Sequence, residues 1–123
     1  MWRAKRGEYY YSYDCVGDII RNKENWDLVD EELFYNFNYF QTKELAKEYM
    51  LSQYGKRAEI EQWYYFIDFT DKYSPQVKSK REEHSEEDFK RYIGRNYYVN
   101  KLNAYNDINR YLNMLLEYYR NNY

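Results

Sequence analysis

A pattern that occurs twice constrains the fold of this chain more than any other feature. Residues 38–46 read Asn-Tyr-Phe-Gln-Thr-Lys-x-x-Ala, and residues 96–104, which start 58 positions later, read Asn-Tyr-Tyr-Val-Asn-Lys-x-x-Ala. The tyrosine-rich runs at Tyr9 and Tyr64 lie 55 positions apart, so about three residues are inserted between the two segments. In a chain rich in Asn, Tyr and Lys, chance similarity is the alternative to duplication.

The first copy is expected to begin with a hairpin and to end with a helix. Tyrosine-rich residues 8–13 and residues 19–21 are predicted strands. Asp30 is predicted to cap a short helix. Thr42 is predicted to cap a helix over residues 43 to about 54.

The second copy has the same predicted order. Residues 62–69 and 76–80 form a second expected hairpin, and Ser85 begins a sequence close to a capping box. Asn100 is predicted to cap a last helix over residues 101 to about 120.

Short extended segments at residues 38–41 and 96–99 complete the two predicted copies. We therefore expect an α+β fold, in which an antiparallel sheet is built from two diverged hairpin–short helix–strand–helix units. The helices are expected to pack on one face of this sheet. We predict a single domain over residues 1–123, with repeat units at 8–55 and 62–120.

The last predicted helix carries a long apolar stripe. Its members recur at spacings of three and four residues: Tyr105, Ile108, Leu112, Leu115 and Tyr119. The stripe fits two interpretations, a helix packed between the sheet and its neighbouring helix or the seam of a homodimer.

Tyrosine dominates the composition. With 19 tyrosines among 123 residues, we expect tyrosine to supply much of the core, and its buried hydroxyl groups to need hydrogen-bond partners. The net charge of −2 and the pI near 5.5 have the wrong sign for a protein that binds nucleic-acid phosphates nonspecifically.

The single cysteine, Cys15, predicts a reducing compartment, so we expect the protein in the cytoplasm of a host cell. No apolar run approaches the roughly 20 residues that a membrane span needs, and no apolar segment follows the basic residues 1–6. We therefore predict neither secretion nor membrane insertion.

The residue types that carry most catalysis are sparse and scattered. His84 is the one histidine and lies in an acidic stretch, whereas Cys15 lies in a predicted turn without a nearby cation to lower its pKa. The four glycines are isolated, so no phosphate-binding loop is indicated. We predict no catalytic residue, no cofactor and no metal ligand, and therefore a protein that is not an enzyme.

Two acidic clusters are candidates for partner binding. One cluster precedes the first extended segment and consists of Glu24, Asp27, Asp30, Glu31 and Glu32. The other precedes the second extended segment and consists of Glu82, Glu83, Glu86, Glu87 and Asp88. If the clusters lie together, they present a carboxylate field that resembles a nucleic-acid backbone and fits a basic groove. The alternative is that they are solvated helix N-termini.

A weaker prediction is a surface that stacks the bases of single-stranded nucleic acid. It would combine the aromatic run at residues 63–66 with Lys78, Lys80 and Arg81, or with the basic residues of segment 90–101. Strand alternation would bury half of these rings, so fewer of them could stack on bases.

The chain resembles a set of small uncharacterised proteins from phages and prophages of low-GC Gram-positive bacteria. The similarity covers roughly the first 50 residues and, more weakly, the second copy. It is carried by Trp2, Gly7-Glu8-x-Tyr10-Tyr11, Trp26, Asp30 and Asn38-x-Phe40-x-Thr42-Lys43-Glu44-x-Ala46. In that family a glycine usually precedes the Asn, whereas here Phe37 does.

The resemblance implies a mobile-element context, in which small non-enzymatic proteins often block host defence, anti-CRISPR proteins among them. The leading prediction is a phage or prophage accessory protein that binds and inhibits a host protein, such as a CRISPR effector nuclease. The alternatives are a single-stranded nucleic-acid-binding phage protein and a homo-oligomeric component of a virion.

Overall fold

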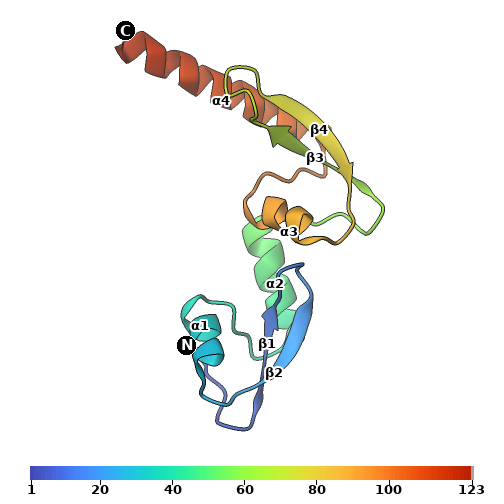
Figure 1. Cartoon of the computed structure of the whole chain (residues 1–123), viewed down its shortest axis with the longest axis vertical. Helices are drawn as coiled ribbons and strands as arrows, with labels where there is room; N and C mark the ends of the chain where they lie inside the picture. Colours follow the sequence, from blue (N-terminus) through green and yellow to red (C-terminus); the bar gives the residue numbers. More distant parts are fainter. Residues whose placement is uncertain (123) are drawn as a thin grey trace. The chain divides into compact units, whose positions relative to one another are not determined.

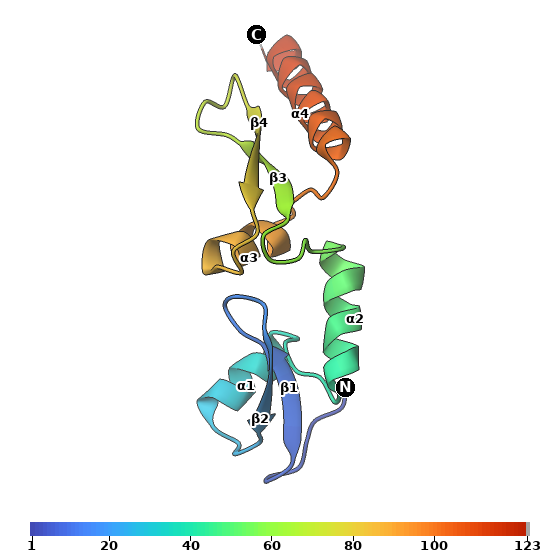
Figure 2. The same cartoon turned by 90° about the vertical axis from the view of Figure 1, so that its right-hand side faces the viewer.

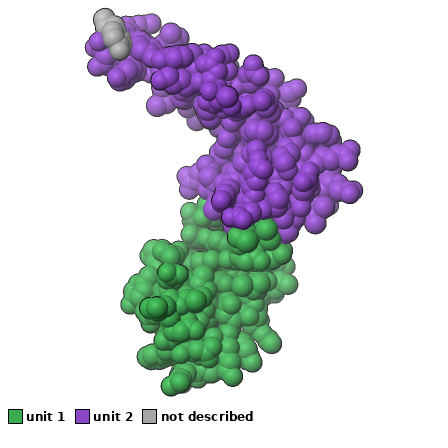
Figure 3. Space-filling model, viewed as in Figure 1, with its two compact units in different colours: residues 1–55 green, residues 56–123 purple. Residues whose placement is uncertain are grey.

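The computed structural model describes residues 1–122 and divides the chain into two compact units (Figure 1, Figure 3). Unit 1 covers Met1–Gly55, and unit 2 begins at Lys56. Each unit contains two strands, a short helix and a longer helix, in that order. The predicted α+β class is confirmed.

Unit 1 is built around the hairpin of β1 (Tyr9–Tyr13) and β2 (Ile19–Lys23). The helices α1 (Leu28–Tyr35) and α2 (Lys43–Tyr54) follow it. Between them, Phe40 forms an isolated antiparallel bridge with Tyr11, through two backbone hydrogen bonds of 2.8 Å. The predicted extended segment is therefore a single bridging residue.

Unit 2 has the same plan with longer strands and a longer final helix. Its hairpin pairs β3 (Trp63–Asp68) with β4 (Gln76–Arg81), and its helices are α3 (Glu86–Ile93) and α4 (Lys101–Asn122). Tyr98 bridges to Tyr65 as Phe40 bridges to Tyr11. Tyr11 and Tyr65 are 54 positions apart, whereas Phe40 and Tyr98 are 58 positions apart. Unit 2 therefore has four more residues than unit 1 between the two bridging residues.

Two parts of the predicted architecture are wrong. The described residues form two separate two-stranded sheets, not one sheet. In unit 1 the helices also lie on opposite faces of the hairpin (Figure 2). Tyr10 donates a hydrogen bond to Asp30 of α1, whereas Tyr13 interacts with Tyr49 of α2. Side chains three apart on a strand point to opposite faces, so each face receives one helix.

The helix ends follow the predicted capping chemistry, with one correction. Thr42 caps α2 and accepts from the Leu45 amide at 3.2 Å, and Ser85 caps α3 in a capping box, as predicted. The cap of α1 is Asp27, not Asp30. Asp30 occupies the third helical position, and its carboxylate accepts from the Asp27 amide in the reciprocal bond of a capping box.

The helix α4 packs against the hairpin of its own unit. Ile108 is buried, the Tyr111 ring lies edge-on to Phe69 at 5.1 Å, and the hydroxyl groups of Tyr119 and Tyr73 are 3.0 Å apart. Ile108 and Tyr119 of the predicted dimer seam are therefore engaged within unit 2. The rest of that stripe is half-buried or exposed: Tyr105, Leu112 and Leu115.

Candidate functional site

The centre of unit 1 is a pair of stacked tyrosines held by two buried carboxylates. The Tyr10 and Tyr39 rings are 3.9 Å apart and inclined by 15°. The Tyr10 hydroxyl donates to the Asp30 carboxylate, and the Tyr39 hydroxyl donates to Glu24 Oε2 at 2.5 Å. The Tyr39 hydroxyl also accepts from the Ala4 amide at 3.0 Å. We call these four residues the tyrosine–carboxylate frame of unit 1.

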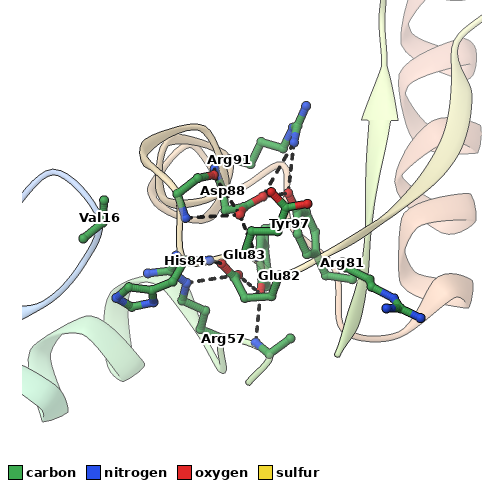
Figure 4. Close-up of polar contacts among 12 residues, drawn as sticks. Val16, Arg57, Arg81, Glu82, Glu83, His84, Asp88, Arg91 and Tyr97 are labelled. Atoms are coloured by element: carbon green, nitrogen blue, oxygen red, sulfur yellow. Dashed lines mark hydrogen bonds and ion pairs between the residues drawn. The ribbon is translucent and has the colours of Figure 1, made fainter. Parts of the chain in front are cut away.

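Unit 2 repeats this frame with Tyr64, Glu82, Asp88 and Tyr97. Figure 4 labels the last three of these residues. The Tyr64 and Tyr97 rings are 4.1 Å apart and inclined by 15°. Tyr64 donates to Asp88, and Tyr97 donates to Glu82 Oε2 at 2.6 Å and accepts from the Ala58 amide at 2.9 Å. The same hydroxyl–carboxylate pairs, in the same register, support duplication of one unit.

An arginine neutralises the buried glutamate of each frame, but the two arginines bind differently. Arg57 forms a bidentate pair with Glu82, with Nε–Oε2 and Nη2–Oε1 distances of 3.1 and 2.9 Å. Arg3 lies 3.5 Å from Glu24 and makes a closer contact, 2.8 Å, with Glu31 on α1. Arg3 therefore has a second acid to hold its charge.

The buried aspartates remain charged because of their hydrogen bonds. Burial acts to raise the pKa of Asp88, but hydrogen bonds from Lys80 and Tyr64 outweigh it and hold the pKa below its usual range. Asp30 is shifted in the same direction, because bonds from Tyr10 and backbone amides outweigh burial. For the tyrosines, burial and then the Glu24 carboxylate raise the pKa of Tyr39 to about 12.

The frame changes the interpretation of the predicted acidic clusters. Four of their ten members are buried and bonded inside the frames, so they present no carboxylate to a partner: Glu24, Asp30, Glu82 and Asp88. Charged groups are buried only when they are paired and hydrogen-bonded, and here the tyrosine hydroxyls supply that pairing. The rest lie wholly or partly at the surface: Asp27, Glu31, Glu32, Glu83, Glu86 and Glu87.

Outside the frame, the two units share two positions at which an exposed or half-exposed non-glycine residue adopts the left-handed conformation. In unit 1 these are Trp26 (φ 59°) and Phe37 (φ 60°). Phe37 follows α1 in a Schellman ending, in which its amide donates to Phe34 and the Asn38 amide donates to Leu33. Glycine is favoured at such a position, because a side chain there is strained. Unit 2 has His84 and Arg95 at the corresponding positions, with φ of 56° and 61°.

The exposed residues on and beside α1 are mostly apolar. Five of them are between 62% and 82% exposed, and we call them the α1 surface: Trp26, Leu28, Val29, Tyr35 and Phe37. Fifty-eight positions later, unit 2 has His84, Glu86, Glu87, Ile93 and Arg95. The pattern within one copy does not reveal this surface, whereas a position-by-position comparison of the two copies at that offset shows the change from apolar to charged residues.

The aromatic and basic residues predicted to stack nucleic-acid bases are mostly used within unit 2. Tyr64 is fully buried in the frame, Lys78 pairs with Asp68, and Lys80 lies 2.8 Å from Asp88. Trp63 is exposed, with the Arg81 guanidinium 5.4 Å from its ring centre. This leaves one exposed ring of the four, and the arginine occupies one side of it.

Cys15 is exposed in the turn of the first hairpin, and the His84 amide donates to Glu82 at 3.0 Å. Within residues 1–122, no group of three or more His, Cys, Asp and Glu side chains is placed to hold a metal ion. Over the same range, no helix has both the length and the apolar character to cross a membrane. The chain matches no known family model, no curated protein and no solved structure.

Proposed function

We propose that this chain is a phage or prophage accessory protein that binds a host protein in the cytoplasm and inhibits it by direct contact. The first target to test is a CRISPR effector nuclease. The phage context comes from the sequence resemblance described above. The structure supports the binding part of the proposal.

The observation that carries the binding proposal is the contrast between interior and surface in the two units. The frame keeps its tyrosines, aspartate and glutamate in both copies, with matching hydrogen bonds. The exposed residues around α1 and α3 differ at every position compared above. Conserved cores mainly serve folding, whereas surfaces serve recognition. The two units have the same interior residues but different surface residues, which is the pattern expected if the surfaces serve recognition.

The proposal is tested by plating phage on a defence-positive bacterium that expresses the chain. We expect a rise in plating efficiency, and a direct block of target cleavage when purified effector is mixed with the chain. The control is a variant with both Tyr64→Ala and Tyr97→Ala, which loses the ring pair of unit 2. No protection and no protein recovered above background in a pull-down would overturn the proposal.

The same preparation separates the alternatives. A single-stranded nucleic-acid binder would shift labelled oligonucleotide in a gel, with an affinity that falls as salt rises. A virion component would form large oligomers in light scattering at high concentration. We expect neither result for this chain.

A further inference from the structure

We propose that the α1 surface of unit 1 is the docking site for the partner, and that the partner supplies a protein segment of apolar side chains flanked by Lys or Arg. This inference rests on the proposed function and names the surface and the chemistry of its ligand. Five exposed apolar side chains, spread over an eight-residue helix and its two flanks, carry it.

These side chains are close enough together for one partner segment to cover them. A helix rises about 1.5 Å per residue, so α1 is about 12 Å long. Leu28 and Tyr35 are seven positions apart and therefore lie on one side of the helix. Trp26 and Phe37 lie beyond the two ends of α1, each within two residues of it. Exposed aromatic residues grouped in this way are typical of interaction sites.

The fold does not need apolar residues at these positions. Unit 2 forms the same frame and the same Schellman ending with His84, Glu86, Glu87 and Arg95 at the positions of Trp26, Leu28, Val29 and Phe37. The same fold therefore tolerates polar or charged residues at these positions. Because the apolar residues of unit 1 also face solvent, we infer that they serve binding and not folding.

Charge decides which kind of partner fits. The segment from residue 24 to 42 contains five acids and neither Lys nor Arg. Two arginines lie beside Trp26: Arg6 lines a hollow with it, and the Arg3 guanidinium is 5.5 Å from its ring centre. The charge of Arg3 is offset by Glu24 and Glu31. Two of the five acids, Asp27 and Glu32, are exposed beside the apolar side chains. This charge repels an anionic membrane and a second copy of the same surface, and attracts a cationic segment. The equivalent segment 82–100 of unit 2 also contains five acids, but Lys90, Arg91 and Arg95 reduce its acidic excess.

The test uses a variant designed from the protein's own second copy. The swap variant carries Trp26→His, Leu28→Glu, Val29→Glu and Phe37→Arg, the residues that unit 2 has at these positions. Because unit 2 folds around them, we expect the same urea midpoint as in the wild-type chain. Leu28→Ala with Val29→Ala is the second variant, should the first fail to fold, because alanine is the best helix former.

The full wild-type chain is used to select from a random peptide library without subtraction, and the affinity of the enriched peptides is then measured for the wild-type chain and for the swap variant. We expect the wild-type chain to enrich peptides that combine Leu, Ile, Phe or Trp with Lys or Arg. Their affinity should fall about ten-fold or more in the swap variant, the loss that follows from removing a binding hot spot. It should also weaken as salt rises.

Three results would overturn the inference: peptides that bind both proteins equally, enrichment of acidic peptides, or self-association of the wild-type chain that the swap variant abolishes. Phage plating separates this inference from the proposed function. If the wild-type chain and the swap variant both protect phage, the function stands and this docking surface is wrong. If selected peptides need the α1 surface but the wild-type chain does not protect phage, the surface stands and the inhibitory role is wrong.

Discussion

Unit 1 and unit 2 hold the same stacked tyrosines on the same buried carboxylates, but each supports them in its own way. In unit 2 the glutamate depends on one arginine and the aspartate on a lysine, whereas in unit 1 the arginine is shared between two acids. Unit 2 also has a longer hairpin and a final helix of 22 residues, against 12 in unit 1. The comparison teaches that the tyrosine–carboxylate frame is the constant part, while charge partners and surfaces vary.

The largest expected effect comes from removing the frame glutamates. Glu82→Ala leaves Arg57, whose side chain is 14% exposed, without its bidentate partner, and breaking such a buried pair costs about 3–5 kcal/mol. Glu24→Ala should cost less, because Arg3 keeps Glu31. Urea unfolding followed by tryptophan fluorescence measures both free energies of unfolding. The exposed neighbour variant Glu83→Ala is the control, with little change, and equal losses for the two glutamates would contradict the comparison.

Removing a frame hydroxyl should have the next largest effect. Tyr10→Phe and Tyr64→Phe each leave a buried aspartate with one donor fewer, at a cost of about 1–3 kcal/mol. Tyr64→Phe should be the more destabilising, because that hydroxyl also accepts from Arg91 at 2.9 Å. Urea unfolding of both variants tests this order. A Tyr11→Phe variant is the control, since its hydroxyl is outside the frame.

A pH titration distinguishes the pKa of Asp30 from the pKa of Asp88. Their folded pKa values lie below the unfolded value of about 3.9, so they stabilise the fold above that pH and lose this contribution as the pH falls through the folded pKa. Lys80→Met should raise the pKa of Asp88, leave that of Asp30 unchanged, and move acid unfolding to higher pH. NMR titration of the side-chain carboxyl groups measures both. Lys78→Met, which removes a cation paired with Asp68, should leave Asp88 unchanged.

At alkaline pH the tyrosines are expected to limit stability. The pKa of Tyr39 is raised to about 12 from an ordinary value near 10, so its contribution is complete below pH of about 10 and is lost as the pH rises toward 12. Absorbance of the phenolate, recorded together with circular dichroism, should show ionisation of the frame tyrosines coinciding with unfolding. Tyr73 lies outside the frames, and a hydrogen bond from Tyr119 together with Lys72 lowers its pKa, so it should ionise earlier without loss of structure and serves as the internal control.

The smallest expected effect is a gain in stability at the helix endings. Phe37→Gly and Arg95→Gly should each stabilise the chain by up to about 1 kcal/mol, because glycine relieves the left-handed strain but loses more entropy on folding. Thermal unfolding measures both variants. Only Phe37→Gly should weaken the binding of selected peptides. If Arg95→Gly weakens it equally, the distinction between the two surfaces fails.

Local sequence signals predict the order of the helices and strands, but they do not predict which acidic side chains are buried through contacts with distant residues. Thr42, Ser85 and the tyrosine-rich strands give the element order, because caps and alternation act within a few residues. Glu24 and Glu82 were assigned to the surface because most acids are solvated. Their burial depends on Tyr39 and Tyr97, 15 residues away in each unit, which sequence periodicity does not reveal. The excess of tyrosine was the available clue, since buried hydroxyls need acceptors.

The frame also determines how the chain should respond to temperature. Unfolding exposes phenol hydroxyls and carboxylates together with the rings, and exposed polar surface lowers the heat capacity of unfolding while apolar surface raises it. A core rich in polar-edged rings should therefore have a smaller heat-capacity change than an aliphatic core of the same size. Its stability curve would be flatter, and the fold would weaken little on cooling or moderate warming.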